Sequence, residues 1–192
     1  MTCDEILFPK AWNDWMNEKW FLEIKENLET LIKKISKISD DRAIALVGAL
    51  VIENLIDALL QAILPKYSIL NTRDFSFYHK IKLCKALSLI PNTYLNGAIV
   101  IKDIRNDFAH DLNITSFNDL EPTVFQSIKD HLINRSIYGG YETINDLYIK
   151  FIQNTAVVLF MYQKKLEIFN KFIRQENISE ILLEFYKEQI KL

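Results

Sequence analysis

The chain has 192 residues, 49% of them hydrophobic and 25% charged, which is enough to bury a sizeable core without a disulfide or a metal. Its formal net charge of −2 excludes a protein that coats nucleic acid by charge alone, because such binding needs a broad basic surface. Its four glycines and four prolines are too few for the turns of a β-sandwich, so the composition predicts an all-α fold.

Two amphipathic or apolar segments open the chain. Apolar residues recur at helical spacing from Trp12 to Ile35 and predict a helix within residues 1–38. A second segment follows the capping residues 39–41 and stops before Pro65. Charged and amide side chains interrupt it, so it reads as the central helix of a bundle and not as a membrane span. The acidic N-terminus also lacks the basic start of a secretory signal, and we expect a cytoplasmic protein.

The next two helices are separated by a Pro-Asn pair. After a polar connection at residues 66–75, a third helix is predicted from Phe77 to Ile90. A fourth runs from Tyr94 to Phe108 or His110.

The remaining chain predicts one short helix, one long helix and a short terminal one. Residues 116–119 carry side chains that can cap a fifth helix ending near Leu132, with Pro122 allowed in its first turn. A sixth helix is predicted over residues 143–173, and a seventh after Asn177 or Ser179.

The glycine pair at residues 139–140 is the best candidate for a boundary, but no low-complexity linker accompanies it. We therefore expect a bundle of about six to seven helices. Its parts are an N-terminal helix at 1–38, a helical core at 39–135, and a long helix with a short terminal helix at 136–192, packed on the same domain.

The most chemically informative segment is Arg-Asn-Asp-Phe-Ala-His at residues 105–110. Asn106 and His110 share a helix face, whereas Arg105 and His110 lie roughly 140° apart on an ideal helix. All three side chains can meet one phosphate if the helix bends or ends near Phe108, or if a second copy of the chain brings its own motif alongside.

These residue types suit metal-free RNA cleavage. RNA carries its own nucleophile, the 2′-hydroxyl, so a nuclease has only to move two protons and neutralise a developing phosphorane. Imidazole can move protons near neutral pH, and a guanidinium can hold two phosphoryl oxygens. No cofactor is needed. The alternative is structural: a solvated Asn106 and Asp107, a core Phe108, and His110 as a cap of the helix C-terminus.

Residues 102–111 resemble the iRN-x-fAH signature of the HEPN superfamily, in the form found in the mannitol operon repressor family. Flanking segments are similar as well, so the resemblance covers about residues 40 to 120. These segments are 41–47 and 53–55, which resemble the opening helix, 77–81 and 86–90, which resemble the next, and 116–119, which resemble the turn after the motif.

The resemblance implies a HEPN-like helical core that pairs through its motif-bearing helices, in a superfamily with many toxin, antiphage-defence and RNA-processing ribonucleases. By position, Arg105 would contact the phosphate, Asn106 would be the polar residue that often follows it, and His110 would be the catalytic histidine. A DNA-binding repressor would have a helix-turn-helix or a basic recognition helix, and this chain shows neither.

Other polar residues are candidates for supporting roles. Lys80, Lys85 and Lys102 form a local basic region that could guide RNA, although a solvated helix face explains them equally well. Glu53 and Asp57 stand one turn apart on an apolar helix, where they lie on its polar stripe or hold Arg105 in place. The histidines and cysteines match no metal-ligand spacing, so no metal site is predicted.

Two functions remain open. The first is a metal-independent HEPN-type endoribonuclease, a homodimer that cleaves RNA and is controlled by an antitoxin or regulatory protein. The second is a catalytically silent helical module, similar to the mannitol repressor family, that acts by binding a partner protein. The retained Arg105, Asn106 and His110 favour the first.

Overall fold

The computed structural model describes residue 26 and residues 29–64, 66–70, 75–133 and 143–175. Within this part 82% of the residues are helical and none is in a strand, which confirms the all-α prediction. Residues 29–35 are helical. The rest of the predicted N-terminal helix, the glycine pair and the short terminal helix lie outside the described residues.

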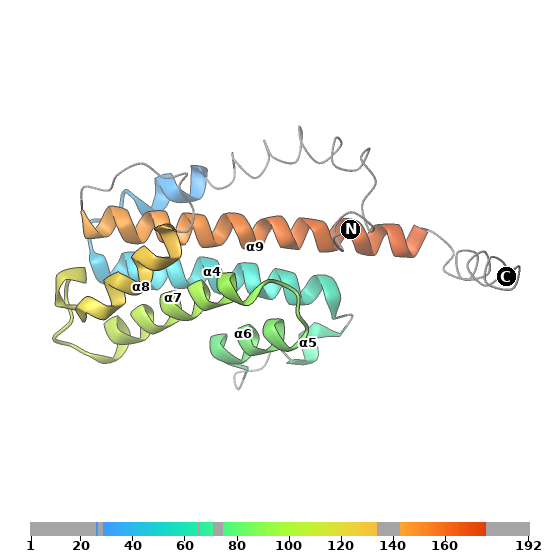
Figure 1. Ribbon diagram of the computed structural model, residues 1–192, viewed down its shortest axis with the longest axis horizontal. Coiled ribbons are helices and arrows are strands. Elements are labelled where there is room, and N and C mark those ends of the chain that lie inside the picture. Colours follow the sequence, from blue (N-terminus) through green and yellow to red (C-terminus); the bar gives the residue numbers. More distant parts are fainter. Residues whose placement is uncertain (1–25, 27–28, 65, 71–74, 134–142, 176–192) are drawn as a thin grey trace, which may run out of the picture.

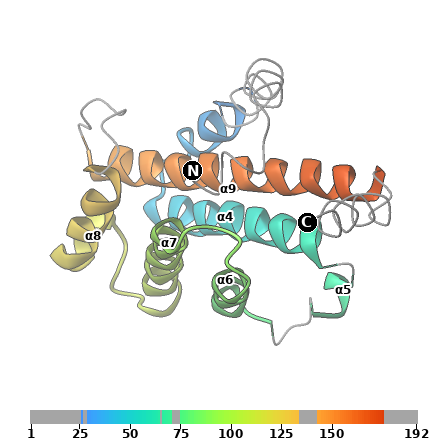
Figure 2. The same cartoon turned by 45° about the vertical axis from the view of Figure 1, so that its right-hand side comes forward.

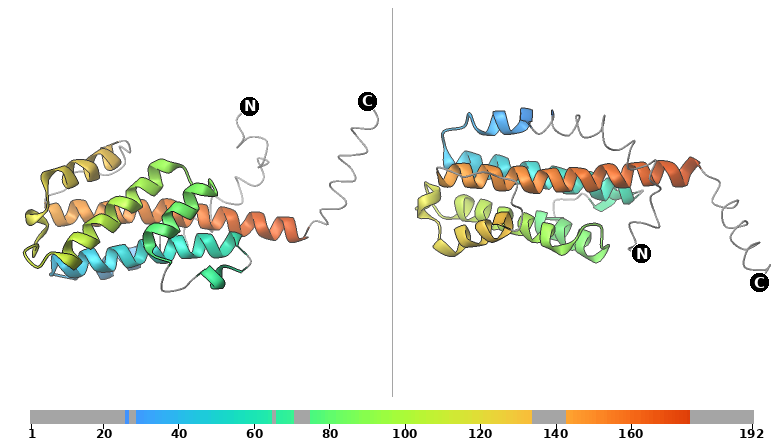
Figure 3. Two further views of the ribbon diagram at one scale, coloured as in Figure 1. Left: turned by 90° about the horizontal axis from the view of Figure 1, so that it is seen from below. Right: turned by 45° about the horizontal axis from the view of Figure 1, so that its top comes forward.

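The bundle is built around two long helices that run side by side (Figures 1 and 3). They are α4 (Asp41–Ile63) and α9 (Ile144–Gln175). The Asn145 amide donates to Asp41 Oδ1 at one end, and the Asn170 amide donates to the Ala62 carbonyl at the other. The two helices therefore run in the same direction, and the core lies where α4 meets α9 and α7.

The sequence accounts for the position of α4. Asp40 caps its N-terminus by accepting a hydrogen bond from the Ala43 N–H at 2.6 Å, as the residues at 39–41 predicted. By length and composition α4 could cross a membrane. Eight of its residues, however, are buried among neighbouring helices, which is the pattern of a core helix in a bundle.

The face of α4 that is turned away from α9 carries α6 (Phe77–Ala86) and α7 (Asn92–His110), which pack against each other (Figure 2). The structure corrects two predictions here. The connection at residues 66–75 contains a short helix, α5 (Tyr67–Leu70). Helix α6 ends before Ile90, because Ser88 takes a left-handed conformation with φ of 51° that a helix cannot continue.

The predicted fifth helix is in fact two elements. Ser116 and Asp119 form a capping box around the 3-10 helix η1 (Phe117–Asp119), and α8 (Pro122–Ile133) begins afterwards. The extended backbone of Leu120 separates them. Glu121 precedes a proline and so disfavours helical geometry, while Pro122 fits the first helical position because it needs no N–H partner.

Two glycines at helix contacts give a paired prediction. A Cβ on Gly48 would lie 2.2 Å from Cδ1 of the buried Ile152, whereas the nearest atom to a Cβ on Gly97 is Thr155 Oγ1 at 3.4 Å. Alanine is favoured over glycine in a helix by about 1 kcal/mol. We expect Gly97→Ala to stabilise the fold by about 0.5–1 kcal/mol, and Gly48→Ala to destabilise it by about 1–2 kcal/mol through overpacking.

Urea unfolding of each variant measures these changes in the free energy of unfolding. The double variant Gly48→Ala with Ile152→Val removes the clashing Cδ1 and should cost less than the sum of its single changes. A Gly48→Ala variant that is stabilised as much as Gly97→Ala would show that Ile152 repacks freely.

Candidate functional site

The motif at residues 105–110 forms the last turns of α7, which stays helical through His110. The N–H of the cap residue Asp111 donates to the Asp107 carbonyl at 3.0 Å, as in an uninterrupted helix. Helix α7 therefore does not end at Phe108. Within one chain, this regular helix does not bring all three side chains together.

Arg105 and Asn106 line a cavity of about 740 Å³ that lies between α4, α6 and α7. This volume falls within the roughly 300–1,000 Å³ of small-molecule and cofactor sites. The walls combine apolar, aromatic and charged side chains. The lining residues are Leu46, Ala49, Leu50, Glu53, Phe75, Ser76, Phe77, Tyr78, Lys80, Lys102, Arg105 and Asn106.

The guanidinium of Arg105 is exposed and donates from Nη1 to Oδ1 of Asn106 at 3.0 Å. No carboxylate pairs with it in the described part of the chain. An exposed guanidinium with this one neutral partner keeps donors free for an anionic ligand.

His110 is also exposed, but it does not line the cavity. It stands five positions after Arg105 on a regular helix, so within one chain the two side chains project in directions roughly 140° apart. One copy of the chain therefore presents the guanidinium in the cavity and the imidazole outside it.

The end of α7 is anchored by aromatic packing. Phe108 is fully buried, with its ring centroid 5.1 Å from that of Phe117 in an edge-to-face contact. The ring of Phe117 in turn packs on that of Tyr148 in α9, with their centroids 4.8 Å apart. Phe108 is thus the core residue of the motif, while the polar residues on either side of it reach solvent.

Two residues at the start of α4 hold the segment after α7 in place. Arg42 donates to the Ile114 carbonyl at 2.8 Å and to the Asp111 carbonyl at 3.3 Å. Asp41 accepts the Phe117 N–H at 2.9 Å. Both residues fall within the segment 41–47 that resembles the family's opening helix, which was the available signal. They fix the backbone next to His110.

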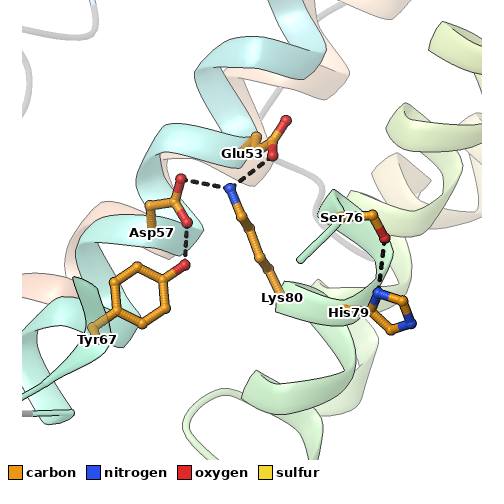
Figure 4. A network of polar contacts seen from close by, with 6 residues as sticks. All are labelled: Glu53, Asp57, Tyr67, Ser76, His79 and Lys80. Carbon is orange, nitrogen blue, oxygen red and sulfur yellow. Dashed lines mark hydrogen bonds and ion pairs between the residues drawn. The ribbon is translucent and has the colours of Figure 1, made fainter. Parts of the chain in front are cut away.

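A partly buried polar network lies at the α6 side of the cavity (Figure 4). The Lys80 ammonium lies 2.8 Å from Glu53 Oε1 and 2.8 Å from Asp57 Oδ2, and the Tyr67 hydroxyl donates to Asp57. Burial disfavours the charged form of Lys80, but the hydrogen bonds that its ammonium donates to Asp57 and Glu53 outweigh this effect and raise the pKa of the lysine. Burial, followed by the bond to Asp57, raises the pKa of Tyr67.

This network corrects two sequence-based predictions. Glu53 and Asp57 hold Lys80, and not Arg105, because the lysine of α6 reaches between them while Arg105 points to the open cavity. Lys80 is only 5% exposed, and both carboxylates occupy its ammonium. It is therefore placed to support the cavity wall and not to bind RNA.

The other two lysines differ from each other in position. Lys85 donates to Asn96 Oδ1 at 2.8 Å and does not line the cavity. Lys102 lines it, pairs with Asp103, and lies 5.2 Å from the centre of the Tyr78 ring. Of the three predicted RNA contacts, Lys102 is the one beside Arg105.

Asp107 lies one turn further along α7 than Asp103. Burial, and then repulsion from Asp103, raises the pKa of Asp107.

The remaining histidines have local partners. His79 Nδ1 lies 3.1 Å from Ser76 Oγ (Figure 4), and His131 Nδ1 lies 2.8 Å from the Ser127 carbonyl. Among the residues that the structure describes, no three histidine, cysteine or carboxylate side chains gather as metal ligands. Burial raises the pKa of the Cys84 thiol to about 12, so this cysteine is a core residue without nucleophilic character.

Comparisons of the chain with known protein families, with curated proteins and with solved structures gave no match.

Proposed function

We propose that the chain is a metal-independent endoribonuclease of the HEPN type that works as a homodimer. The observation that supports this best is the exposed Arg105 beside the half-buried Asn106 in a cavity, with an exposed His110 on the following turn of the same helix. Arg105 pairs only with the neutral Asn106 amide among the described residues, so it keeps donors for a phosphate. Here the core role belongs to Phe108, and the three polar residues remain available.

The chemistry follows from what these groups can do. A base removes the proton from the 2′-hydroxyl, whose oxygen then bonds to phosphorus as the bond from phosphorus to the 5′-oxygen breaks. An acid returns a proton to the leaving 5′-oxygen. The Arg105 guanidinium stabilises the negative charge that develops on the phosphoryl oxygens. The products are a 2′,3′-cyclic phosphate and a 5′-hydroxyl.

A dimer supplies what one chain lacks. If two α7 helices meet around a twofold axis, the His110 of one copy approaches the Arg105 of the other, although the two residues diverge on their own helix. A role in a toxin system, in antiphage defence or in RNA processing, under the control of a protein partner in the cytoplasm, fits such an enzyme.

The test is cleavage of a panel of labelled single-stranded RNAs by the purified chain, with analysis of the product ends. We expect 2′,3′-cyclic phosphate ends, resistance of the same sequences made as DNA, and undiminished cleavage in EDTA. Loss of cleavage in EDTA would contradict the metal-independent mechanism. An intact RNA panel would contradict the nuclease itself.

One observation favours the second candidate, a partner-binding module. Leu46, Val47 and Leu50 of α4 are 37%, 36% and 56% exposed, and two of them border the cavity. An apolar stripe of this kind suits a protein contact. If the RNA panel stays intact, this stripe becomes the principal functional surface.

A further inference from the structure

The cavity between α4, α6 and α7 has two chemically different sides. Lys102, Arg105 and Asn106 of α7 provide cations and an amide, while Phe75 and Tyr78 provide aromatic rings on and just before α6. Leu46 and Leu50 of α4 add apolar surface. A ligand that fills such a space combines an anionic group with a flat, apolar ring.

Tyr78 is the aromatic residue best placed to receive that ring. It is 40% exposed, and two ammonium groups approach its ring, Lys82 at 4.6 Å and Lys102 at 5.2 Å from the centroid. The Phe75 ring is fixed by two neighbours, because it stacks on His79 and contacts Tyr67 edge to face. The wall is therefore formed before any ligand arrives.

Resting on the proposed function, we infer that this cavity binds one unpaired nucleotide of the RNA, its base stacked on Tyr78 and its phosphate held by Lys102 and Arg105. A base on the tyrosine ring displaces one ammonium. An exposed cation–π contact contributes about 0.5–1 kcal/mol, whereas a base stacked on an aromatic side chain contributes about 1–3 kcal/mol. Stacking therefore outweighs the contact it replaces, and the displaced ammonium stays near the phosphate.

The consequence is selectivity for single strands. In a duplex each base is stacked between its neighbours, so its face is not accessible to a protein ring. The Tyr78 site thus determines which RNA reaches Arg105 and His110, without taking part in the proton transfers.

The experiment measures binding apart from cleavage. A short, fluorescently labelled 2′-O-methyl RNA keeps bases and phosphates but has no free 2′-hydroxyl, so the full chain can bind it without cutting it. Anisotropy titrations compare this strand with its duplex and with an abasic strand of equal length. We expect the single strand to bind on the order of tenfold more tightly than either of the other two.

Variants locate the site. Tyr78→Ala should weaken binding of the single strand by on the order of tenfold and leave the weak binding of the abasic strand unchanged. Tyr78→Phe, which keeps the ring, should bind like the wild type. Lys102→Ala should weaken the binding of both strands. Lys85 on α6 does not line the cavity, so Lys85→Ala is the matched control and should bind both strands like the wild type. Circular dichroism checks that each variant is folded.

The outcomes separate the two proposals. Equal binding by Tyr78→Ala and the wild type, or equal binding of duplex and single strand, overturns the nucleotide site even if RNA is cleaved. Binding that depends on Tyr78 while cleavable RNA stays intact supports the site and overturns the nuclease. Absence of binding to every probe overturns the nucleotide site, and cleavage assays then decide the nuclease separately.

Discussion

Replacing His110 with alanine is expected to slow RNA cleavage by roughly 10²–10⁴-fold, the usual contribution of a general acid or base. The fold should barely change, because His110 is exposed and makes none of the core contacts that surround Phe108. We expect a change in the free energy of unfolding within about 0.5 kcal/mol. Single-turnover cleavage and urea unfolding of the same preparation measure the two effects.

His79 offers a control for this experiment. It is also exposed, but its ring nitrogen is paired with Ser76 and it lies outside the motif, so His79→Ala should keep the rate of the chemical step.

Arg105→Lys tests the phosphate contact. It keeps the charge but loses the two-pronged phosphate contact, and it should therefore be strongly impaired. Unfolding of His110→Ala would instead assign the histidine a structural role.

A mixture of the two inactive chains tests the shared site. If Arg105→Ala and His110→Ala chains exchange subunits, a mixed dimer contains one site with the arginine from one chain and the histidine from the other. Part of the wild-type activity should then return. No recovery, in a mixture shown to exchange subunits, would mean that both residues act from the same chain.

The sequence predicted most of the helices because their caps and breakers are local. Asp40, Pro91 and Pro122 lie at or next to helix ends in the structure, near the positions where the residue types placed them. The errors arose where two local signals competed. Ser116 was assigned to the helix that starts at Pro122, yet its capping box with Asp119 closes a separate turn.

The site was less predictable, because its partners come from distant parts of the chain. Spacing along α7 placed Arg105, Asn106 and His110 correctly relative to one another. It could not show that Lys80 of α6 would pair with Glu53 and Asp57, since these partners lie 27 and 23 positions away in sequence. Tyr78 was passed over for the same reason: only the packing of α6 against α7 brings its ring next to Lys102.

The largest effect on stability is expected at Lys80. Its side chain is 7% exposed, and those of Glu53 and Asp57 are 29% and 16% exposed. Removing one partner of a buried ion pair costs about 3–5 kcal/mol, since it leaves uncompensated charge in the interior. Glu53 can partly turn to water, so we expect Lys80→Met to lose about 2–3 kcal/mol of unfolding free energy. Lys85→Met, on the same helix but paired only with an amide, should change it by less than about 0.5 kcal/mol.

The pH dependence of this loss identifies its cause. Because the pKa of Lys80 is raised above the 10.5 of a free lysine, the folded state holds this proton more tightly than the unfolded state. Its stabilising effect is therefore complete below about pH 10.5 and is lost as the pH rises through the higher folded-state value. The difference in unfolding free energy between the wild type and Lys80→Met, measured by urea unfolding, should stay constant from neutral pH to about 10.5 and shrink above it.

A triple variant tests the role of the charge directly. Neutralising the carboxylates as well, in Glu53→Gln with Asp57→Asn and Lys80→Met, should recover most of the lost stability. If that triple variant is no more stable than Lys80→Met, the lysine contributes through packing of its aliphatic chain and not through its charge.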